Sequence, residues 1–286
     1  METINKIDEC RAAMQELRKR GNKIGFVPTM GFLHEGHLSL IRMAQRDCDK
    51  VIISIFVNPM QFGPDEDFKK YPRDIKRDTS LAEKEGVDYI FNPSVQEMYG
   101  QDHKTTVEVK ELSSVMCGKY RPGHFAGVAT VVLKLFNIIN AHKAYFGEKD
   151  YQQLVIIKKM VTDLNLDIEI ESGPMVREED GLALSSRNRY LSGVERENAT
   201  ILYKCLNIAR DMIAGGENDL EKIKKRVLEE LEGNKFVRKV DYFDFRDPLT
   251  LQEKRRVRRG EDGEILVAVA AWIGNTRLID NIIIKV

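Results

Sequence analysis

The sequence lacks the features typical of membrane proteins and of disulfide-stabilised secreted proteins. No apolar run approaches the roughly eighteen residues of a transmembrane helix, and the first residues contain no apolar signal core. The cysteines Cys10, Cys48, Cys117 and Cys205 are scattered and form no Cys-x-x-Cys pair. Dispersed thiols are the default of a reducing cytosol. We therefore expect a soluble, cytoplasmic protein without a membrane partner.

The chain also lacks a net charge, because 45 Lys and Arg residues balance 45 Asp and Glu residues. No global field attracts nucleic acid, so small-molecule partners are expected and a nucleic-acid partner is not. The basic stretch at residues 254–259 is a local exception. We interpret it as a solvated loop, with an RNA contact as the less favoured alternative.

Apolar runs alternate with helical patterns over the first 175 residues. Strands are predicted at residues 24–27, 51–57, 87–91, 141–146 and 167–171. Helices are predicted at residues 4–20, from about residue 38, and at 75–85, 127–139 and 152–162. This alternation predicts the α/β class, with a Rossmann-like doubly wound parallel sheet whose ligands bind beyond the carboxyl ends of the strands.

The pattern changes after about residue 175. Two helices, at 194–213 and 218–232, precede strands at 237–245, 265–273 and 276–284. We therefore predict two domains, a Rossmann-like domain at 1–175 whose strand ends would bind the ligands, and a smaller α+β domain at 176–286. A segment with short hydroxyl side chains, Ser185-Ser186-Arg187, lies near the joint between them.

One strand-turn-helix segment, residues 28–40, contains the densest set of candidate functional residues. Pro28 to Gly31 is predicted to turn the chain before a helix. His34 and His37 are three residues apart, so their rings share a face in a first helical turn, beside free N–H groups and the positive end of the helix dipole. Such a place attracts phosphate. Gly36 removes a side chain where a base or sugar approaches the backbone.

Other interpretations of the two histidines are a zinc site and ordinary surface or capping residues. Helical zinc pairs usually have a four-residue step, and no third ligand lies nearby in the sequence, so no resident metal site is expected. Neither Gly-x-Gly-x-x-Gly nor Gly-x-x-x-x-Gly-Lys-Ser/Thr occurs. The turn that contains His34 and His37, the histidine turn, is therefore the candidate for binding phosphate.

Several motifs, taken in order, resemble one known family. His-x-Gly-His after Pro-Thr-Met-Gly resembles the signature of the adenylyl-transferring superfamily that includes class I aminoacyl-tRNA synthetases. The chain as a whole resembles the pantothenate synthetase family, on the segments 28–41, 56–62, 68–74, 121–127, 146–153 and 184–188. The resemblance implies an ATP-dependent, AMP-forming ligase that joins pantoate to β-alanine through a pantoyl adenylate, with Mg²⁺ accompanying ATP. It also implies a homodimer.

The resemblance also implies roles for particular residues. Catalytic roles are implied for His34, His37, Lys149, Ser185, Ser186 and Arg187. Nucleotide contacts are implied for these and for Pro28, Thr29, Met30, Gly31, Phe32, Leu33, Glu35, Gly36, Gly147, Glu148, Asp150, Val176 and Leu184. Pantoate contacts are implied for Asn58, Gln61, Gln153, Met30 and Phe62. These assignments suit the chemistry, because cations and N–H donors stabilise phosphates, while neutral amides orient a carboxylate without tight ion pairing.

Some alternatives stay open on the sequence alone. A nucleotidyltransferase with the same first domain, an RNA-binding relative of a synthetase, and a metal-binding protein without catalysis would each share some of these features. Arg121 and His124 fit a loop near the site or a half-buried structural role equally well.

Overall fold

The structure is a computed structural model that describes every residue except 65, 259 and 261–262. The chain forms two compact units. Unit 1 contains Met1–Ser114, Arg121–Glu148 and Ile156–Pro174. Unit 2 contains Val115–Tyr120, Lys149–Val155 and Met175–Val286. The units are therefore not two continuous halves of the chain, and a functional division at residue 175 stays a prediction.

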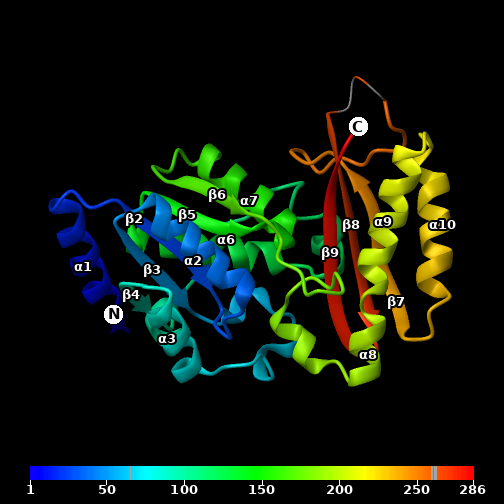
Figure 1. The fold of residues 1–286 in the computed structure, drawn as a ribbon. Helices are drawn as coiled ribbons and strands as arrows, with labels where there is room; N and C mark the ends of the chain where they lie inside the picture. Colours follow the sequence, from blue (N-terminus) through cyan, green and yellow to red (C-terminus); the bar gives the residue numbers. More distant parts are fainter. Residues whose placement is uncertain (65, 259, 261–262) are drawn as a thin grey trace. The chain divides into compact units, whose positions relative to one another are not determined.

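A parallel sheet forms the centre of unit 1 (Figure 1). Within the described residues it has six strands in the order β1-β4-β3-β2-β5-β6. These are β1 (Glu2–Ile4), β2 (Ile24–Thr29), β3 (Lys50–Ile55), β4 (Tyr89–Phe91), β5 (Lys143–Gly147) and β6 (Glu169–Gly173). The helices are α1 (Ile7–Lys19), α2 (Glu35–Asp47), α3 (Ile75–Lys84), α4 (Val95–Met98) and α6 (His124–Ile139), with short 3-10 turns η1 (Pro59–Gln61) and η2 (Asp67–Lys69). The predicted doubly wound fold is confirmed.

Helices cover both faces of this sheet because successive strand side chains alternate between the faces. On one face, Val27 and Ile53 pack with Ile41 of α2 and Ala82 of α3 in one buried cluster. On the other face, the ring of Phe136 in α6 contacts the rings of Phe26 in β2 and Phe146 in β5. The near-continuous apolar runs of the sequence are thus explained by strands buried on both sides.

The structure corrects two sequence expectations near the amino terminus. Ile4 is not helical. It lies in β1, is buried, and pairs with Phe91 of β4, a partner 87 positions away that apolar periodicity cannot reveal. Pro28 does not begin the turn either, because β2 continues to Thr29 with Pro28 paired to Ser54. The pairing of β2 with β5 stops at Phe26, so Pro28 lies beyond the part of β2 that is paired on both sides and can lack an N–H.

Unit 2 contains an antiparallel sheet of β7 (Val237–Arg246), β8 (Glu264–Ile273) and β9 (Thr276–Lys285). Three α-helices precede it, α8 (Gly193–Asn198), α9 (Ile201–Ala214) and α10 (Leu220–Glu232), together with the 3-10 helix η4 (Ser186–Tyr190). The short elements α5 (Met116–Tyr120) and η3 (Glu148–Asp150) and helix α7 (Tyr151–Asp163) have residues in this unit. The predicted small α+β domain is therefore confirmed.

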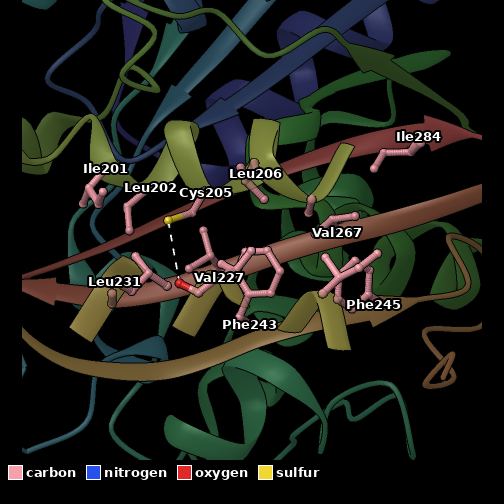
Figure 2. Packing of buried hydrophobic residues seen from close by; sticks show 14 of the residues in the cluster. Ile201, Leu202, Cys205, Leu206, Val227, Leu231, Phe243, Phe245, Val267 and Ile284 are labelled. Carbon is pink, nitrogen blue, oxygen red and sulfur yellow. Dashed lines mark hydrogen bonds between the residues drawn. The ribbon is translucent and has the colours of Figure 1, made fainter. Parts of the chain in front are cut away.

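The core of unit 2 lies between the sheet and helices α9 and α10 (Figure 2). Leu202 and Leu206 of α9 and Val227 of α10 are almost fully buried against Phe243 of β7 and Val267 of β8. Apolar residues at helical spacing therefore meet alternate residues of the strands. The strands predicted at 237–245, 265–273 and 276–284 agree with β7, β8 and β9 to within three residues.

Two further expectations for unit 2 have different outcomes. The predicted helix 194–213 is divided into α8 and α9. At the break the Thr200 hydroxyl donates to the carbonyl of Glu197 at 2.8 Å, a side-chain bond that competes with helical backbone bonds. In the basic stretch 254–259, Arg255, Arg256 and Arg258 are exposed, as a solvated loop requires, while Arg259 lies outside the described residues.

Candidate active site

The histidine turn of unit 1 connects β2 to α2. Its start is held by Thr29, whose hydroxyl donates to the Ser54 carbonyl at 2.7 Å and accepts from the Gly31 N–H at 3.1 Å. Gly31 and Phe32 then adopt positive φ angles of 81° and 51°. This left-handed step suits glycine and is strained for phenylalanine, so the turn needs an outside contact to hold it.

Asp78 of α3 provides that contact. Its carboxylate is 1% exposed and accepts the N–H groups of Phe32 at 2.6 Å and Leu33 at 2.7 Å. Burial raises the pKa of Asp78, while these two N–H donors favour its ionised form. A Cβ on Gly31 would lie 3.0 Å from the Asp78 carboxylate, so the glycine is needed for space as well as for its φ angle. Sequence analysis missed Asp78, because no motif includes it.

The rings of His34 and His37 stack at the entrance of α2, with centroids 4.0 Å apart and planes tilted by 32°. The shared face expected from their spacing is therefore present. The His34 N–H donates to Nδ1 of His37 at 3.3 Å. Because a backbone N–H can only donate, Nδ1 of His37 must accept, and the neutral ring bears its proton on Nε2. The ring of His37 can therefore offer an Nε2–H.

A second, local contact explains why residue 36 is a glycine, besides the approach of a ligand expected from the sequence. A Cβ at this position would lie 3.1 Å from both Cε1 and Nδ1 of His34. That approach is closer than ordinary van der Waals contact. The glycine therefore makes room for the His34 ring itself, whatever approaches the backbone from outside.

A buried amide network follows β3. The side-chain amide of Asn58 donates to Oε1 of Gln61 at 3.1 Å and to the Gly127 carbonyl at 3.0 Å, while its oxygen accepts the Tyr99 hydroxyl at 2.7 Å. The Gln61 amide in turn donates to the sulfur of Met30 at 3.2 Å. Gln61 thus lies beside the histidine turn within unit 1, and its side-chain amide is oriented by Asn58 and Met30.

A second group of side chains holds the backbone of Gln61. Nδ1 of His124 lies 2.7 Å from the Gln61 carbonyl, and Arg121 donates to the same oxygen at 3.3 Å. Glu66 accepts two bonds of 2.6 Å from Arg121. Burial raises the pKa of Glu66, but the Arg121 guanidinium outweighs it and the net pKa is lowered. Arg121 and His124 are both half-buried and both contact the Gln61 carbonyl, and a role in the site stays a prediction.

The close approach of two backbone segments explains why residue 127 is a glycine. A Cβ on Gly127 in α6 would lie 2.3 Å from the Met60 carbonyl oxygen, so only glycine allows α6 to lie against η1. Phe62, the predicted apolar contact for pantoate, is half-buried, with its ring 5.4 Å from that of Phe68 and 6.0 Å from that of Tyr71.

The remaining predicted residues lie mostly in unit 2. Lys149 is in η3, with its ammonium group 3.7 Å from the Asp150 carboxylate, and their side chains are 21% and 50% exposed. Of the adjacent glutamines, Gln152 is buried; its side chain accepts the N–H of Cys117 in α5 and donates to the carbonyl of Val115, the residue before α5. Gln153 is half-buried.

The Ser-Ser-Arg segment begins η4. Ser185 accepts the Arg187 N–H at 3.2 Å, so its hydroxyl caps the start of η4. Ser186 is 8% exposed. Asn188 ties the segment to its own chain through Glu178 and the Ala183 carbonyl, both at 3.1 Å. The segment is therefore an ordered turn within unit 2.

The predicted site residues thus form separate sets. Unit 1 brings together the histidine turn and the acid-binding candidates Met30, Asn58 and Gln61. It also contains Gly147, the last residue of β5, and Glu148 directly after it. Unit 2 contains Lys149, Asp150 and Gln153 and the segments at 176 and 184–187. Tyr99, Asp78 and Glu66 were missed by sequence analysis, since each is recognisable only through its partners.

Within the described residues, every helix is too short or too polar to span a membrane. The same residues contain no group of three or more His, Cys, Asp or Glu side chains that could hold a metal ion.

The parallel sheet and the His-x-x-His turn at the carboxyl end of β2 define the class of protein, a Rossmann-like α/β protein with the turn of the superfamily that the sequence resembles. The sequence model of the pantoate-β-alanine ligase family matches residues 2–283. The chain belongs to this family, and the predicted activity class, a ligase, is confirmed.

Individual relatives match this chain over nearly its full length. A pantothenate synthetase from Caldicellulosiruptor saccharolyticus is 57% identical over 286 residues, which is 100% of both chains. The crystal structure of pantothenate synthetase from Thermus thermophilus has a TM-score of 0.91 and 44% identity, covering 99% of each chain. Pantoate-β-alanine ligase from Francisella tularensis, solved with β,γ ATP and β-alanine, has a TM-score of 0.80 and 36% identity, covering 99% of this chain and 97% of that one.

Proposed function

We propose that the protein condenses pantoate with β-alanine to form pantothenate, converting ATP to AMP and pyrophosphate through a pantoyl adenylate. Family membership and the names of the relatives support the overall reaction. The observation that supports this order of steps best is local to unit 1. The histidine turn, suited to phosphate, lies beside Gln61, whose amide contacts Met30 of the same turn. A phosphate and an acid can therefore meet there.

In the first step a pantoate carboxylate oxygen attacks the α-phosphorus of ATP, and the bond to pyrophosphate breaks. The barrier arises from bringing anions together, so cations and N–H donors facing the phosphates lower it. We assign this role to His34 and His37, with Nε2–H of His37 donating to the phosphate oxygen. We also assign it to Lys149 and to the hydroxyl and guanidinium groups of residues 185–187.

The acid is held by amides. Gln61 and Gln153 are assigned to the pantoate carboxylate and hydroxyl, with Asn58 orienting Gln61 through the bond of 3.1 Å. Neutral amides position the carboxylate without reducing its nucleophilicity as an arginine would. In the second step the amine of β-alanine attacks the acyl carbon of the adenylate, the amine loses a proton, and AMP leaves.

Mg²⁺ is assigned to the phosphates of ATP, because this ion is usually bound through one or two carboxylates together with substrate phosphates. Bound there, it would neutralise phosphate charge, and Asp150, half exposed beside Lys149, is the carboxylate that we assign to orienting it. We also propose a homodimer, as the resemblance implies. A cytoplasmic location is proposed because all four cysteines are free.

Isotope exchange tests the proposal. Labelled pyrophosphate should exchange into ATP in the presence of pantoate and Mg²⁺ without β-alanine, because adenylation alone is reversible. Exchange that depends on β-alanine would contradict the two-step order. A nucleotidyltransferase that stops at the first step would never release AMP with an amide product.

A further inference from the structure

A buried ion pair fastens the segment before the Ser-Ser-Arg turn to strand β9. Arg177 donates to the Asp280 carboxylate at 2.7 and 2.8 Å and to the Asn281 carbonyl at 3.1 Å. The side chain of Asp280 is 1% exposed and that of Arg177 is 17% exposed. Burial raises the pKa of Asp280, which Arg177 opposes by favouring the ionised form. A bidentate pair in this setting fixes both direction and distance.

The same arginine closes the hairpin that leads to Ser185. Arg177 also donates to the Gly181 carbonyl at 2.9 Å, and its guanidinium lies 4.0 Å from the ring centroid of Tyr203. Gly181 has a φ of 92°, and a Cβ there would lie 2.2 Å from the Tyr203 ring. The hairpin ends with the Leu184 N–H bonded to the Val176 carbonyl at 3.1 Å. Residues 185–187 follow at once, so their position depends on this hairpin.

The next residue of β9, Asn281, binds the segment that contains Lys149. The side-chain amide of Asn281 donates to the carbonyl of Lys149 at 2.9 Å. Neighbouring residues of a strand point to opposite faces of its sheet. Two adjacent positions can therefore hold two segments that are far apart in the sequence, one on each face.

We propose that Asp280 and Asn281 form one positioning element that sets Lys149 and the Ser-Ser-Arg turn relative to each other. The inference rests on the proposed function, in which both groups act on the phosphates of ATP. Strand β9 is paired with β8 from Thr276 to Lys285, and this continuous pairing makes it a rigid support. Asp280 and Asn281 are positioning residues, because neither is assigned a contact with substrate.

Asn281→Asp tests the proposal with little change of shape. The carboxylate cannot donate to the Lys149 carbonyl, so the backbone of η3 loses its attachment. We expect pyrophosphate exchange to slow by about tenfold or more in kcat, within the range of couplings in one hydrogen-bonded network, with the KM for pantoate unchanged. Asn281→Ala should act in the same direction. Arg177→Lys, which keeps the charge but loses the bidentate geometry, should slow exchange as well.

Asn275→Ala is the matched control, because Asn275 lies in the exposed turn between β8 and β9, where its amide oxygen accepts from Arg238 at 2.9 Å. Its exchange rate should match that of the unaltered protein. Asn281→Ala and Lys149→Ala should also be combined. If Asn281 acts through Lys149, the double variant should be hardly slower than Lys149→Ala alone.

The outcomes are distinguishable. If Lys149→Ala leaves exchange intact, the proposed function of Lys149 fails. If Lys149→Ala slows exchange while both Asn281 variants and Arg177→Lys keep it, the positioning element is overturned. A fall in melting temperature with normal exchange per folded molecule would show a merely structural role and would also overturn it.

Discussion

Gln61→Glu is the most informative substitution, because it changes one atom of a buried side chain in the proposed acid site. The new carboxylate can still accept the Asn58 amide now 3.1 Å from Oε1. It loses only the bond of 3.2 Å from Nε2 to the Met30 sulfur, a weak acceptor. The fold should therefore survive, and any effect should come from the charge.

The magnitude follows from the proposed contact with the pantoate carboxylate. Two like charges about 4 Å apart at an effective dielectric near 20 repel by about 4 kcal/mol, which is close to a thousandfold in affinity. Gln61→Ala only removes a hydrogen bond to a charged group, at about 1.5 to 3 kcal/mol. The charged variant should thus be the weaker binder of pantoate, although its side chain is the closer match in shape.

Calorimetry of pantoate and of ATP, each alone, checks the reasoning. ATP affinity should barely change in either variant, since the phosphates are assigned to other residues. As the pH falls, pantoate binding by Gln61→Glu should recover toward that of Gln61→Ala, because burial raises the pKa of the new carboxyl and protonation removes its charge. Gln15→Glu, the same change on the exposed face of α1, is the control. Loss of ATP binding with pantoate binding intact in Gln61→Glu would refute the proposed division of the site.

Three further predictions concern other parts of the site. Lys149→Ala should slow adenylate formation by about a hundredfold, or roughly 3 kcal/mol, and should leave attack by the amine on preformed adenylate nearly unchanged. Single-turnover experiments measure the two half-reactions separately. Equal slowing of both would argue against a contact between Lys149 and the phosphates. Asp78→Asn presents only one acceptor oxygen to the two N–H groups of Phe32 and Leu33. Denaturant unfolding should therefore show a free energy of unfolding lower by about 1 to 3 kcal/mol. An unchanged unfolding midpoint would show that the turn does not need the Asp78 carboxylate. Glu66 has a lowered pKa in the folded state, so the stability from its pair with Arg121 is present above the unfolded value of 4.5 and is lost as the pH falls through the folded value. The stability difference between the protein and Glu66→Gln should shrink over that range, and a difference independent of pH would contradict the assignment.

Local sequence patterns predicted the strands and helices well, because the formation of these elements depends mainly on residues that are neighbours in the chain. Apolar runs ending at Asn58-Pro59 and Asn92-Pro93 gave the positions of β3 and β4 to within a few residues. The stacked rings of His34 and His37 follow from a spacing of three residues and helix geometry alone. The family resemblance likewise rests on short motifs, and the full-length match to the family confirms it.

Contacts between distant segments were not predictable in this way. No spacing rule links Asp78 to the N–H groups of Phe32 and Leu33, 46 and 45 positions earlier. Arg177 and Asp280 are 103 positions apart, and in the sequence each is one charged residue among many. The break between α8 and α9 also escaped, since the apolar period continues across it.

The sequence by itself thus determined the α/β class, the order of most strands and helices, and the histidine turn, because backbone periodicity and turn chemistry act within a few residues. Only the tertiary structure decided what holds the site in shape, namely Asp78 under the turn, His124 and Arg121 on the Gln61 carbonyl, and β9 beneath Lys149. A hydrogen bond needs its partners within about 3 Å, and that proximity depends on how whole elements pack rather than on any local pattern.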